Sequence, residues 1–171
     1  KIQDYSASAI ILSGGPSSVF EEGAPTLDKK IFELGVPILG ICYGLQLTSH
    51  LLGGKVVSSQ HREYGRAVLK VLVNDTLFDG VPKQTNVWMS HGDRVEKIPE
   101  GFVKLAETSS IPFGAIKHTD SNIYGVQFHP EVHHSDFGKK ILGNFIFNVS
   151  GIKADWDMAN FIKMETQRLK D

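Results

Sequence analysis

Two continuous apolar runs, each ending in a glycine-rich turn, constrain the fold of this chain more than any other feature. The first covers residues 9–12 and breaks at residues 14–16, and the second, VPILGI, covers residues 36–41. Segments with helical periodicity follow these runs, over residues 24–35 and 43–54. Strands that are apolar throughout are buried on both faces. The alternation of strand and helix therefore predicts a parallel α/β sheet with helices on either side.

The middle of the chain has a different pattern, with short runs in which apolar and polar residues partly alternate. Turn residues, such as residues 74–75 and 120–122, separate these runs, which is typical of antiparallel or mixed sheet. Toward the C-terminus the sequence predicts one helix from near Ser135 to Gly151 and another over residues 154–171. The chain becomes more polar after Gly151, so we place a domain boundary there.

Composition excludes several classes of protein. The 171 residues are 41% hydrophobic and 22% charged, with a formal net charge of -1, which fits a globular domain and does not indicate a nucleic-acid partner. A single cysteine excludes an internal disulfide framework and indicates a reducing, cytoplasmic setting. No apolar run is long enough to span a bilayer, and the start of the chain lacks the apolar core of a signal peptide. Because the chain begins without Met, we expect a fragment or a processed chain.

The single cysteine, Cys42, lies in the sequence GICYGLQ, where Gly40 and Gly44 flank it. This is the spacing of a nucleophile held on a sharp turn between a strand and a helix, where side chains on the flanking residues would clash with neighbouring elements. A helix that begins near Tyr43 would direct its free N–H groups at the sulfur and favour the reactive thiolate. A buried structural thiol explains the same residue, and the turn alone leaves both interpretations open.

The segment FHPEVHH places a histidine beside a carboxylate in a constrained way. His129 and Glu131 are two positions apart, so in extended chain their side chains lie on the same side, and Pro130 favours that geometry. Glu131 would then orient His129 as a general base. Two alternatives stand beside this interpretation. One is a zinc site that also uses His133 and His134, and the other is a polar loop in which the first histidine satisfies a backbone group.

The glycine pair Gly14-Gly15, in SGGP, follows the first predicted strand as Cys42 follows the second. Because the carboxyl ends of parallel strands meet at one edge of a sheet, we expect the two turns to be neighbours. The Gly15 N–H would then lie where it can stabilise an oxyanion. The alternative is an ordinary turn between strand and helix, since the spacing of a phosphate-binding loop is absent.

Five motifs, in the order SGGP, GICYGLQ, REYG, MSHGD and FHPEV, resemble those of the class I (triad-type) glutamine amidotransferases. Within that family they are most similar to the glutaminase domains of GMP synthetases, over roughly residues 9–150. The resemblance implies a three-layer, flavodoxin-like α/β fold around a mixed, mostly parallel sheet, with the family's first strand and helix missing ahead of Lys1. It also implies a glutaminase domain over residues 1–150, and a link over residues 151–171 into an ATP-pyrophosphatase synthetase domain.

The resemblance further implies hydrolysis of the side-chain amide of L-glutamine to glutamate and ammonia through a cysteine–histidine–glutamate triad. No metal or cofactor is expected in this domain, whereas ATP and Mg2+ would act in the synthetase domain, where ammonia converts XMP to GMP. Alternatives are the glutaminase of another amidotransferase, a γ-glutamyl hydrolase or peptidase, and, least favoured, a non-catalytic α/β interaction module. The implied roles are catalytic for Cys42, His129 and Glu131, oxyanion-binding for Gly15 and Tyr43, and substrate-binding for Gly14, Gln46, Ser90, His91 and Asp93.

Overall fold

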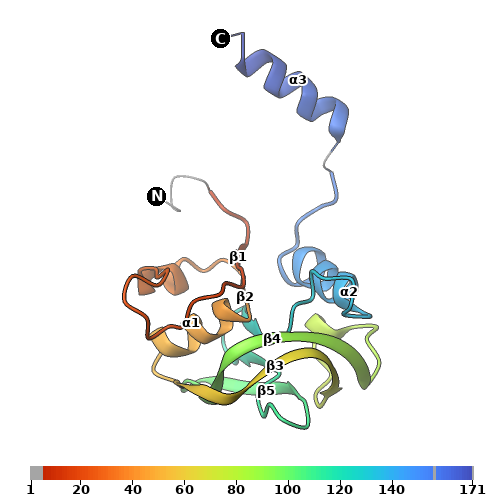
Figure 1. Ribbon diagram of the computed structural model, residues 1–171. Helices are drawn as coiled ribbons and strands as arrows, with labels where there is room; N and C mark the ends of the chain where they lie inside the picture. Colours follow the sequence, from red (N-terminus) through yellow and green to blue (C-terminus); the bar gives the residue numbers. More distant parts are fainter. Residues whose placement is uncertain (1–5, 156, 171) are drawn as a thin grey trace.

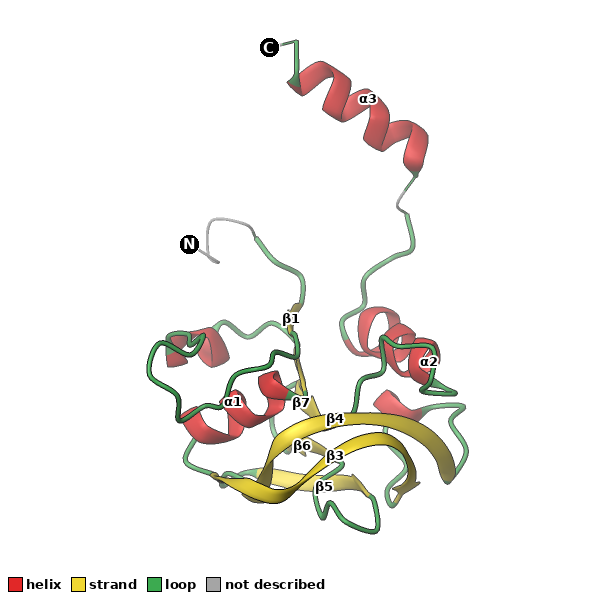
Figure 2. Ribbon diagram, in the orientation of Figure 1, coloured by secondary structure: helices red, strands yellow, loops and turns green. Residues whose placement is uncertain are grey.

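The two apolar runs form neighbouring parallel strands, as the sequence predicts. In the computed structural model, which describes residues 6–155 and 157–170, they are β1 (Ile10–Leu12) and β2 (Ile38–Ile41). A third strand, β7 (Ile123–Val126), pairs in parallel with the other side of β2. Figure 1 labels β1 and β2, and Figure 2 also labels β7. Every residue of β2 and β7 is buried. The carboxyl ends of all three strands lie at the same edge of the sheet, where ligands of α/β proteins bind.

The other four strands pair antiparallel: β3 (Lys55–Val71), β4 (Gln84–Lys97), β5 (Phe102–Glu107) and β6 (Ala115–His118). The described strands form one sheet in the order β1-β2-β7-β6-β5-β3-β4, in which β3 and β4 are long and curved (Figure 2). The predicted mixed α/β sheet is confirmed, but the expectation that it is mostly parallel is wrong. The links between β5, β6 and β7 are too short for the helical crossover that parallel pairing requires.

Only one of the two helices predicted in the first part of the chain forms as expected. This helix, α1 (Tyr43–Leu51), follows β2 after a single residue. Residues 24–35 contain instead a short 3-10 turn, η2 (Lys29–Glu33), so the prediction of a full helix there is wrong. Of the residues in η2 only Ile31 is buried. The Asp28 carboxylate caps the turn by accepting the Lys30 N–H, and Gly35 follows it with a positive φ, so too few residues lie between them for a full α-helix.

The predicted C-terminal helices are shorter than the sequence indicates. The first, α2 (Gly138–Gly143), begins after Ser135 rather than at it, and continues as a π-helical turn, η4 (Asn144–Val149). This turn packs against the 3-10 turn η3 (Thr76–Phe78). The last helix, α3 (Met158–Arg168), stands apart from the sheet at the end of an extended segment (Figure 1). A domain boundary between η4 and α3 stays a prediction.

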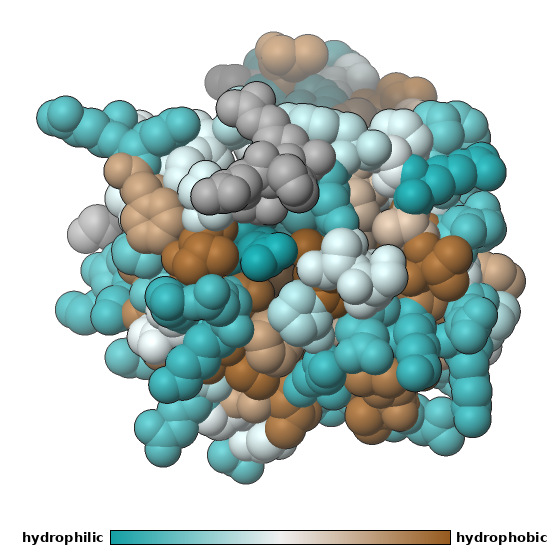
Figure 3. All heavy atoms as spheres, turned by 60° about the horizontal axis from the view of Figure 1, so that its bottom comes forward, coloured by the Kyte–Doolittle hydropathy of each residue, from teal (hydrophilic) through white to brown (hydrophobic). Residues whose placement is uncertain are grey.

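The outer surface is mixed in polarity. On the face that Figure 3 shows, hydrophilic side chains predominate, and hydrophobic ones lie between them in several separate groups. This fits the near balance of 18 lysine and arginine residues against 19 aspartate and glutamate residues. Within residues 6–155 and 157–170, no helix is long and apolar enough to cross a membrane.

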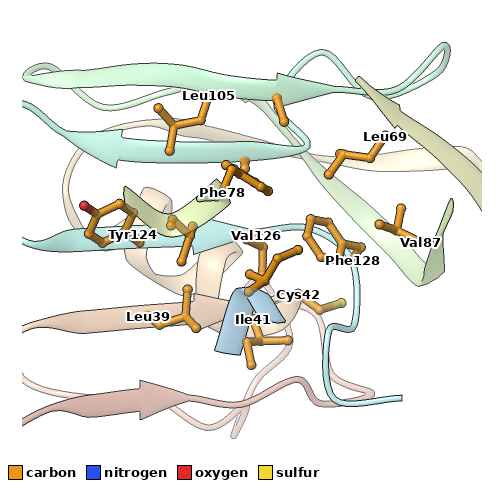
Figure 4. Packing of buried hydrophobic residues seen from close by; sticks show 14 of the residues in the cluster. Leu39, Ile41, Cys42, Leu69, Phe78, Val87, Leu105, Tyr124, Val126 and Phe128 are labelled. Carbon is orange, nitrogen blue, oxygen red and sulfur yellow. The ribbon is translucent and has the colours of Figure 1, made fainter. Parts of the chain in front are cut away.

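Neighbouring residues of β2 contribute to two separate hydrophobic cores, one on each face of the sheet. Leu39 belongs to the core that includes Ile141 of α2 and Phe145 of η4, part of which Figure 4 shows. Ile38 belongs to the other core, together with Leu45 of α1. Successive residues of a strand point to opposite faces, so helices cover both faces of the sheet. The predicted three-layer α/β architecture is confirmed.

Candidate active site

Cys42 occupies the sharp turn between β2 and α1. Its backbone has a φ of 51° and a ψ of -102°, and in the described ranges only Cys42 and Ser6 are non-glycine residues with positive φ. Such a backbone costs roughly 1–3 kcal/mol and persists only where surrounding contacts hold it. Here the Cys42 N–H donates to the Val126 oxygen at 2.8 Å, and the Cys42 oxygen accepts from the Gln46 N–H at 3.1 Å. The end of β7 and the first turn of α1 therefore fix the turn.

The two glycines that flank Cys42 are required by close approach. A Cβ on Gly44 would lie 2.1 Å from the carbonyl oxygen of Leu12, and a Cβ on Gly40 would lie 2.6 Å from the carbonyl carbon of Gly44. Both contacts are with backbone, which cannot move aside without shifting a strand or a helix. The predicted clash between flanking side chains and neighbouring elements is confirmed. The contact with Leu12 also shows that the cysteine turn lies against the end of β1.

The Cys42 side chain is buried at the edge of one core, and only 3% of the residue is exposed (Figure 4). The thiol donates to the Ser90 carbonyl oxygen at 3.5 Å, and Gln127 Nε2 lies 3.8 Å from Sγ. Burial raises the pKa of the thiol from 9.0 to about 11, with a smaller upward effect from the Glu131 carboxylate. The Tyr43 N–H and the Gln127 amide lower this pKa. The neutral thiol is thus stable at pH 7, although the turn alone predicts a favoured thiolate.

His129 and Glu131 form the pair that the sequence predicts. His129 Nδ1 and Glu131 Oε1 are 2.6 Å apart, and His129 Nε2 is buried without a hydrogen-bond partner among the described residues. The backbone N–H of His129 donates to the Trp88 oxygen at 3.0 Å, and its carbonyl accepts from Ser135 Oγ at 2.6 Å. One ring nitrogen is therefore oriented by a carboxylate, which leaves the other for a further group.

Gly14 brings the cysteine and the histidine together. A Cβ at this position would lie 2.7 Å from His129 Cε1 and 3.6 Å from Cys42 Cβ, so both side chains border on the same glycine. Gly14 follows β1 as Cys42 follows β2, at the carboxyl edge of the parallel strands. The expectation that the two turns are neighbours is confirmed. A larger residue at position 14 would displace the imidazole.

A cavity of about 690 Å³ opens over Cys42 and His129. Its volume lies within the range of sites that bind small molecules. Two of the residues singled out from the sequence do not line it: Tyr43 directs its N–H at the sulfur, and Glu131 acts through His129. The others all line the cavity: Gly14, Gly15, Cys42, Gln46, Ser90, His91, Asp93 and His129.

Two contacts fix Asp93 at the wall of the cavity. Ser18 Oγ donates to Asp93 Oδ2 at 2.5 Å, and Gln46 Nε2 donates to the Asp93 backbone oxygen at 2.7 Å. The residue itself is largely buried. A carboxylate held in this way can bind an ammonium group. The side chain of Gln46 acts through Asp93, so its direct contact with a substrate stays a prediction.

His91 lies opposite Glu63 in the pairing of β3 with β4. His91 Nε2 is 3.3 Å from Glu63 Oε2, which is an ion-pair distance without hydrogen-bond geometry. Burial lowers the pKa of His91, and the Glu63 carboxylate opposes that shift. The imidazole is therefore neutral at pH 7.

Ser18, Glu63 and Gln127 contact residues of the site but were given no role from the sequence, although Glu63 lies within the motif REYG. Each reaches the site through a contact between segments that are far apart in the chain, which no local pattern predicts. One usable signal lies in β4, where buried positions alternate with more exposed ones and include His91 and Asp93. Polar residues at the buried positions of a strand need partners.

The zinc alternative finds no support in the geometry. Among the residues that the structure describes, no group of three or more histidine, cysteine, aspartate or glutamate side chains is arranged to hold a metal ion. Glu131 contacts His129, whereas the rings of His133 and His134 lie 3.9 Å apart between centroids. His134 also lies on Trp88, at 4.5 Å between centroids. The two neighbouring histidines therefore belong to a separate aromatic cluster.

The chain matches a known family over most of its length. A sequence model described as Glutamine amidotransferase class-I matches residues 1–149. The chain belongs to the class I glutamine amidotransferase family. It is 53% identical to a GMP synthase (glutamine-hydrolyzing) of Aquifex aeolicus over 161 residues, and this alignment covers 94% of the present chain and 32% of the relative. It is 51% identical over 173 residues to the enzyme of the same name from Maridesulfovibrio salexigens, covering 100% of this chain and 34% of the relative.

Solved structures agree with this family assignment. A Thermoplasma acidophilum protein, described as a subunit of GMP synthase, superposes with a TM-score of 0.74 at 28% identity, over 96% of this chain and 79% of that one. A glutamine amido transferase of Methylobacillus flagellatus has a TM-score of 0.61 over 77% of this chain and 54% of its own. At 24% identity the second likeness concerns the fold alone. The predicted α/β class of the fold and the predicted enzyme class, a glutamine amidotransferase, are confirmed.

Proposed function

We propose that the chain hydrolyses the side-chain amide of glutamine, with Cys42 as nucleophile, His129 as its base and Glu131 as the group that orients the base. One observation carries this proposal: Cys42 and His129 border on Gly14, and His129 Nε2 is buried without a partner in the described structure. A base whose other nitrogen contacts a carboxylate can accept a proton from the thiol. Membership of the glutamine amidotransferase family supports the same reaction.

In the first step, His129 Nε2 takes the thiol proton while Cys42 Sγ forms a bond to the amide carbon. The carbonyl electrons move to the oxygen, and the N–H groups of Gly15 and Tyr43 stabilise the resulting oxyanion. One such donor is worth about 3 kcal/mol in the transition state. Because the pKa of the thiol is raised to about 11, the proton leaves during the attack rather than before it. The position of the base is therefore decisive.

In the second step, the carbon–nitrogen bond of the tetrahedral intermediate breaks, and His129 returns its proton to the nitrogen, so that ammonia leaves. Glu131, at 2.6 Å from the other ring nitrogen, stabilises the imidazolium that forms between these events. Water then attacks the γ-glutamyl thioester of Cys42 as His129 takes a proton from it. Glutamate departs, and the sulfur regains a proton from the imidazolium.

We propose that the cavity wall formed by β4 binds the α-ammonium and α-carboxylate groups of glutamine. Asp93 suits the α-ammonium group by charge, and the Ser18 hydroxyl holds the Asp93 carboxylate in one orientation. Ser90 and His91 line the same cavity from neighbouring positions of β4. A neutral His91 can donate one hydrogen bond to the substrate carboxylate.

We further propose that the ammonia serves the amination of XMP to GMP in a longer protein. The chain spans about a third of the length of relatives named GMP synthase. The remaining length would supply a synthetase domain that binds ATP, Mg2+ and XMP. The helix α3, which stands apart from the sheet, would lead toward that domain (Figure 1). The glutaminase steps above use only side chains and N–H groups of this chain.

The test uses the longest natural chain that contains this sequence. Ammonia release is measured from glutamine with and without XMP and ATP, and from γ-glutamyl peptides in place of glutamine. We expect release from glutamine, an increase with XMP and ATP, and GMP as a product. Release without any response to XMP would assign the chain to another amidotransferase. A preference for γ-glutamyl peptides would overturn the assignment of glutamine as substrate.

A further inference from the structure

Gln127 is a buried polar residue to which the proposed mechanism assigns no role. It directly follows β7 and is 0% exposed, and its backbone N–H donates to the Gly114 oxygen at 3.0 Å. The preceding residue, Val126, accepts the backbone N–H of Cys42. Backbone contacts therefore hold Gln127 beside the cysteine turn without help from its side chain.

Packing alone does not explain the side-chain amide of Gln127. Its Nε2 lies 3.8 Å from Cys42 Sγ, while its Oε1 is buried and has no hydrogen-bond partner within the described ranges. An amide oxygen buried without a partner destabilises a fold, and a leucine of similar size would avoid that cost. The amide instead directs a donor at the sulfur, the atom that reacts in the proposed mechanism.

The sulfur of Cys42 takes part in two hydrogen bonds, as the donor in one and as the acceptor in the other. The thiol donates to the Ser90 oxygen at 3.5 Å, and Sγ accepts from Gln127 Nε2. When the thiol proton leaves, the bond to Ser90 is lost because its donor is gone. The bond from Gln127 becomes stronger, since its acceptor is then an anion. The contact of Gln127 with the sulfur therefore strengthens as negative charge develops on Sγ during the attack.

We propose that Gln127 is a positioning residue, which holds the Cys42 sulfur in place from its buried side and stabilises its negative charge by donating a side-chain N–H to Sγ. The inference rests on the proposed role of Cys42 as nucleophile. Burial and the Glu131 carboxylate disfavour the thiolate, so the few donors near it, the Tyr43 N–H and the Gln127 amide, matter more. Five other titratable groups line the cavity. They are Glu21 from the loop after β1, Tyr64 from β3, His91 and Asp93 from β4, and His129 from the loop after β7.

The test measures the reactivity of Cys42 in Gln127 variants of the longest natural chain. Iodoacetamide modifies the thiolate, so the rate of Cys42 labelling, followed by peptide mass spectrometry across neutral and mildly alkaline pH, reports the thiolate fraction. Gln127→Leu keeps the volume and removes the donor. We expect labelling about tenfold slower at each pH, which corresponds to a rise of about one unit in pKa. The kcat for ammonia release should fall while KM for glutamine stays nearly constant.

Asn144→Leu is the matched control. Asn144 is a buried side-chain amide as well, but it lies outside the cavity and donates to the backbone oxygens of Leu77 and Asp79. This variant should lose stability and keep the wild-type labelling rate. A folded Gln127→Leu variant that is labelled at the wild-type rate would overturn the proposal, because a merely structural amide would affect only stability.

If Gln127→Leu does not fold, Gln127→Glu decides the question. It keeps the shape of the side chain but places a carboxylate beside the sulfur, so labelling should again be at least tenfold slower. Unchanged labelling in this variant would also refute the inference. Failure of the proposed function has a different signature. In that case Cys42→Ala would still release ammonia from glutamine, whatever the labelling rates of the Gln127 variants.

Discussion

At the scale of single residues, Cys42 combines two opposing properties. Its strained turn places the sulfur beside the Tyr43 N–H, yet burial outweighs this contact and raises the pKa of the thiol to about 11. A thiol of high pKa is rarely ionised, but its thiolate is intrinsically a strong nucleophile. Reaction then depends on a base that takes the proton during the attack. Gly14 permits this arrangement, because His129 and Cys42 both border on it.

Replacing Gly14 with alanine should remove most activity with little effect on folding. The new Cβ would meet His129 Cε1 at 2.7 Å and displace the imidazole from the cysteine. We expect the kcat for ammonia release to fall about 100-fold, with a melting temperature close to that of the wild type. In the control Gly143→Ala, the nearest atom belongs to Phe147 at 3.9 Å, and kcat should not change. A fully active Gly14→Ala variant would show that the imidazole has another position.

The raised pKa of Cys42 also predicts how stability depends on pH. A group whose pKa is higher in the folded chain than in the unfolded one stabilises the fold below the unfolded pKa. This stabilisation is lost as the pH rises through the folded pKa. For Cys42, whose pKa is raised from 9.0 to about 11, this loss falls between about pH 9 and pH 11. The free energy of unfolding in urea should fall across this pH range by about 2–3 kcal/mol more in the wild type than in Cys42→Ala. Parallel curves for the two proteins would refute the raised pKa.

At the scale of elements, the turn that carries Cys42 depends on how closely α1 approaches β1. The Cα of Gly44 lies so near the Leu12 oxygen that a Cβ there would lie 2.1 Å from it. Gly44→Ala should therefore destabilise the fold by about 2–3 kcal/mol, measured by urea unfolding, because α1 must move off the sheet. Gly143→Ala, within α2, should be neutral or stabilising by up to about 1 kcal/mol. Equal stabilities for both variants would contradict the close packing of the turn.

The elements that the sequence predicted well are those with local signals. The apolar runs of β1 and β2 and the glycines beside Cys42 need no knowledge of distant residues. The helix predicted over residues 24–35 was too long, because its apolar spacing does not show that the turn begins only after the Asp28 cap. Partial alternation also indicated the antiparallel strands in the middle of the chain, where β5, β6 and β7 follow one another closely. The contacts of Glu63 and Gln127, by contrast, depend on pairing between segments that are farther apart in the chain. Periodicity alone carries no information about such pairing.

At the scale of the whole molecule, residues 6–155 and 157–170 form one sheet with its covering helices and a separate helix, α3 (Figure 1). Met158 and Ile162 of α3 are each more than half exposed. Within the globular part, the parallel strands carry the cysteine and glycine turns, while β4 supplies the opposite wall of the cavity. This division predicts that the site and the fold around it do not need α3.

Truncation after Ile152 should leave the globular part as stable as before. The Ile152 N–H donates to the Ile146 oxygen, so the chain is anchored up to that point. We expect a melting temperature within about 2 °C of that of the 171-residue chain, because little apolar surface is exposed by the cut. A much larger decrease would show that α3 packs against the sheet, and would move the domain boundary beyond Gly151.

The central claim, that Cys42 is the nucleophile of a glutaminase, is tested most directly by ammonia release from Cys42→Ala. The variant and the wild type are compared in the longest natural chain, with saturating glutamine, XMP and ATP, after circular dichroism has shown that both are folded. We expect the variant to release ammonia at less than about one thousandth of the wild-type rate. Release at the wild-type rate by the folded variant would contradict the account.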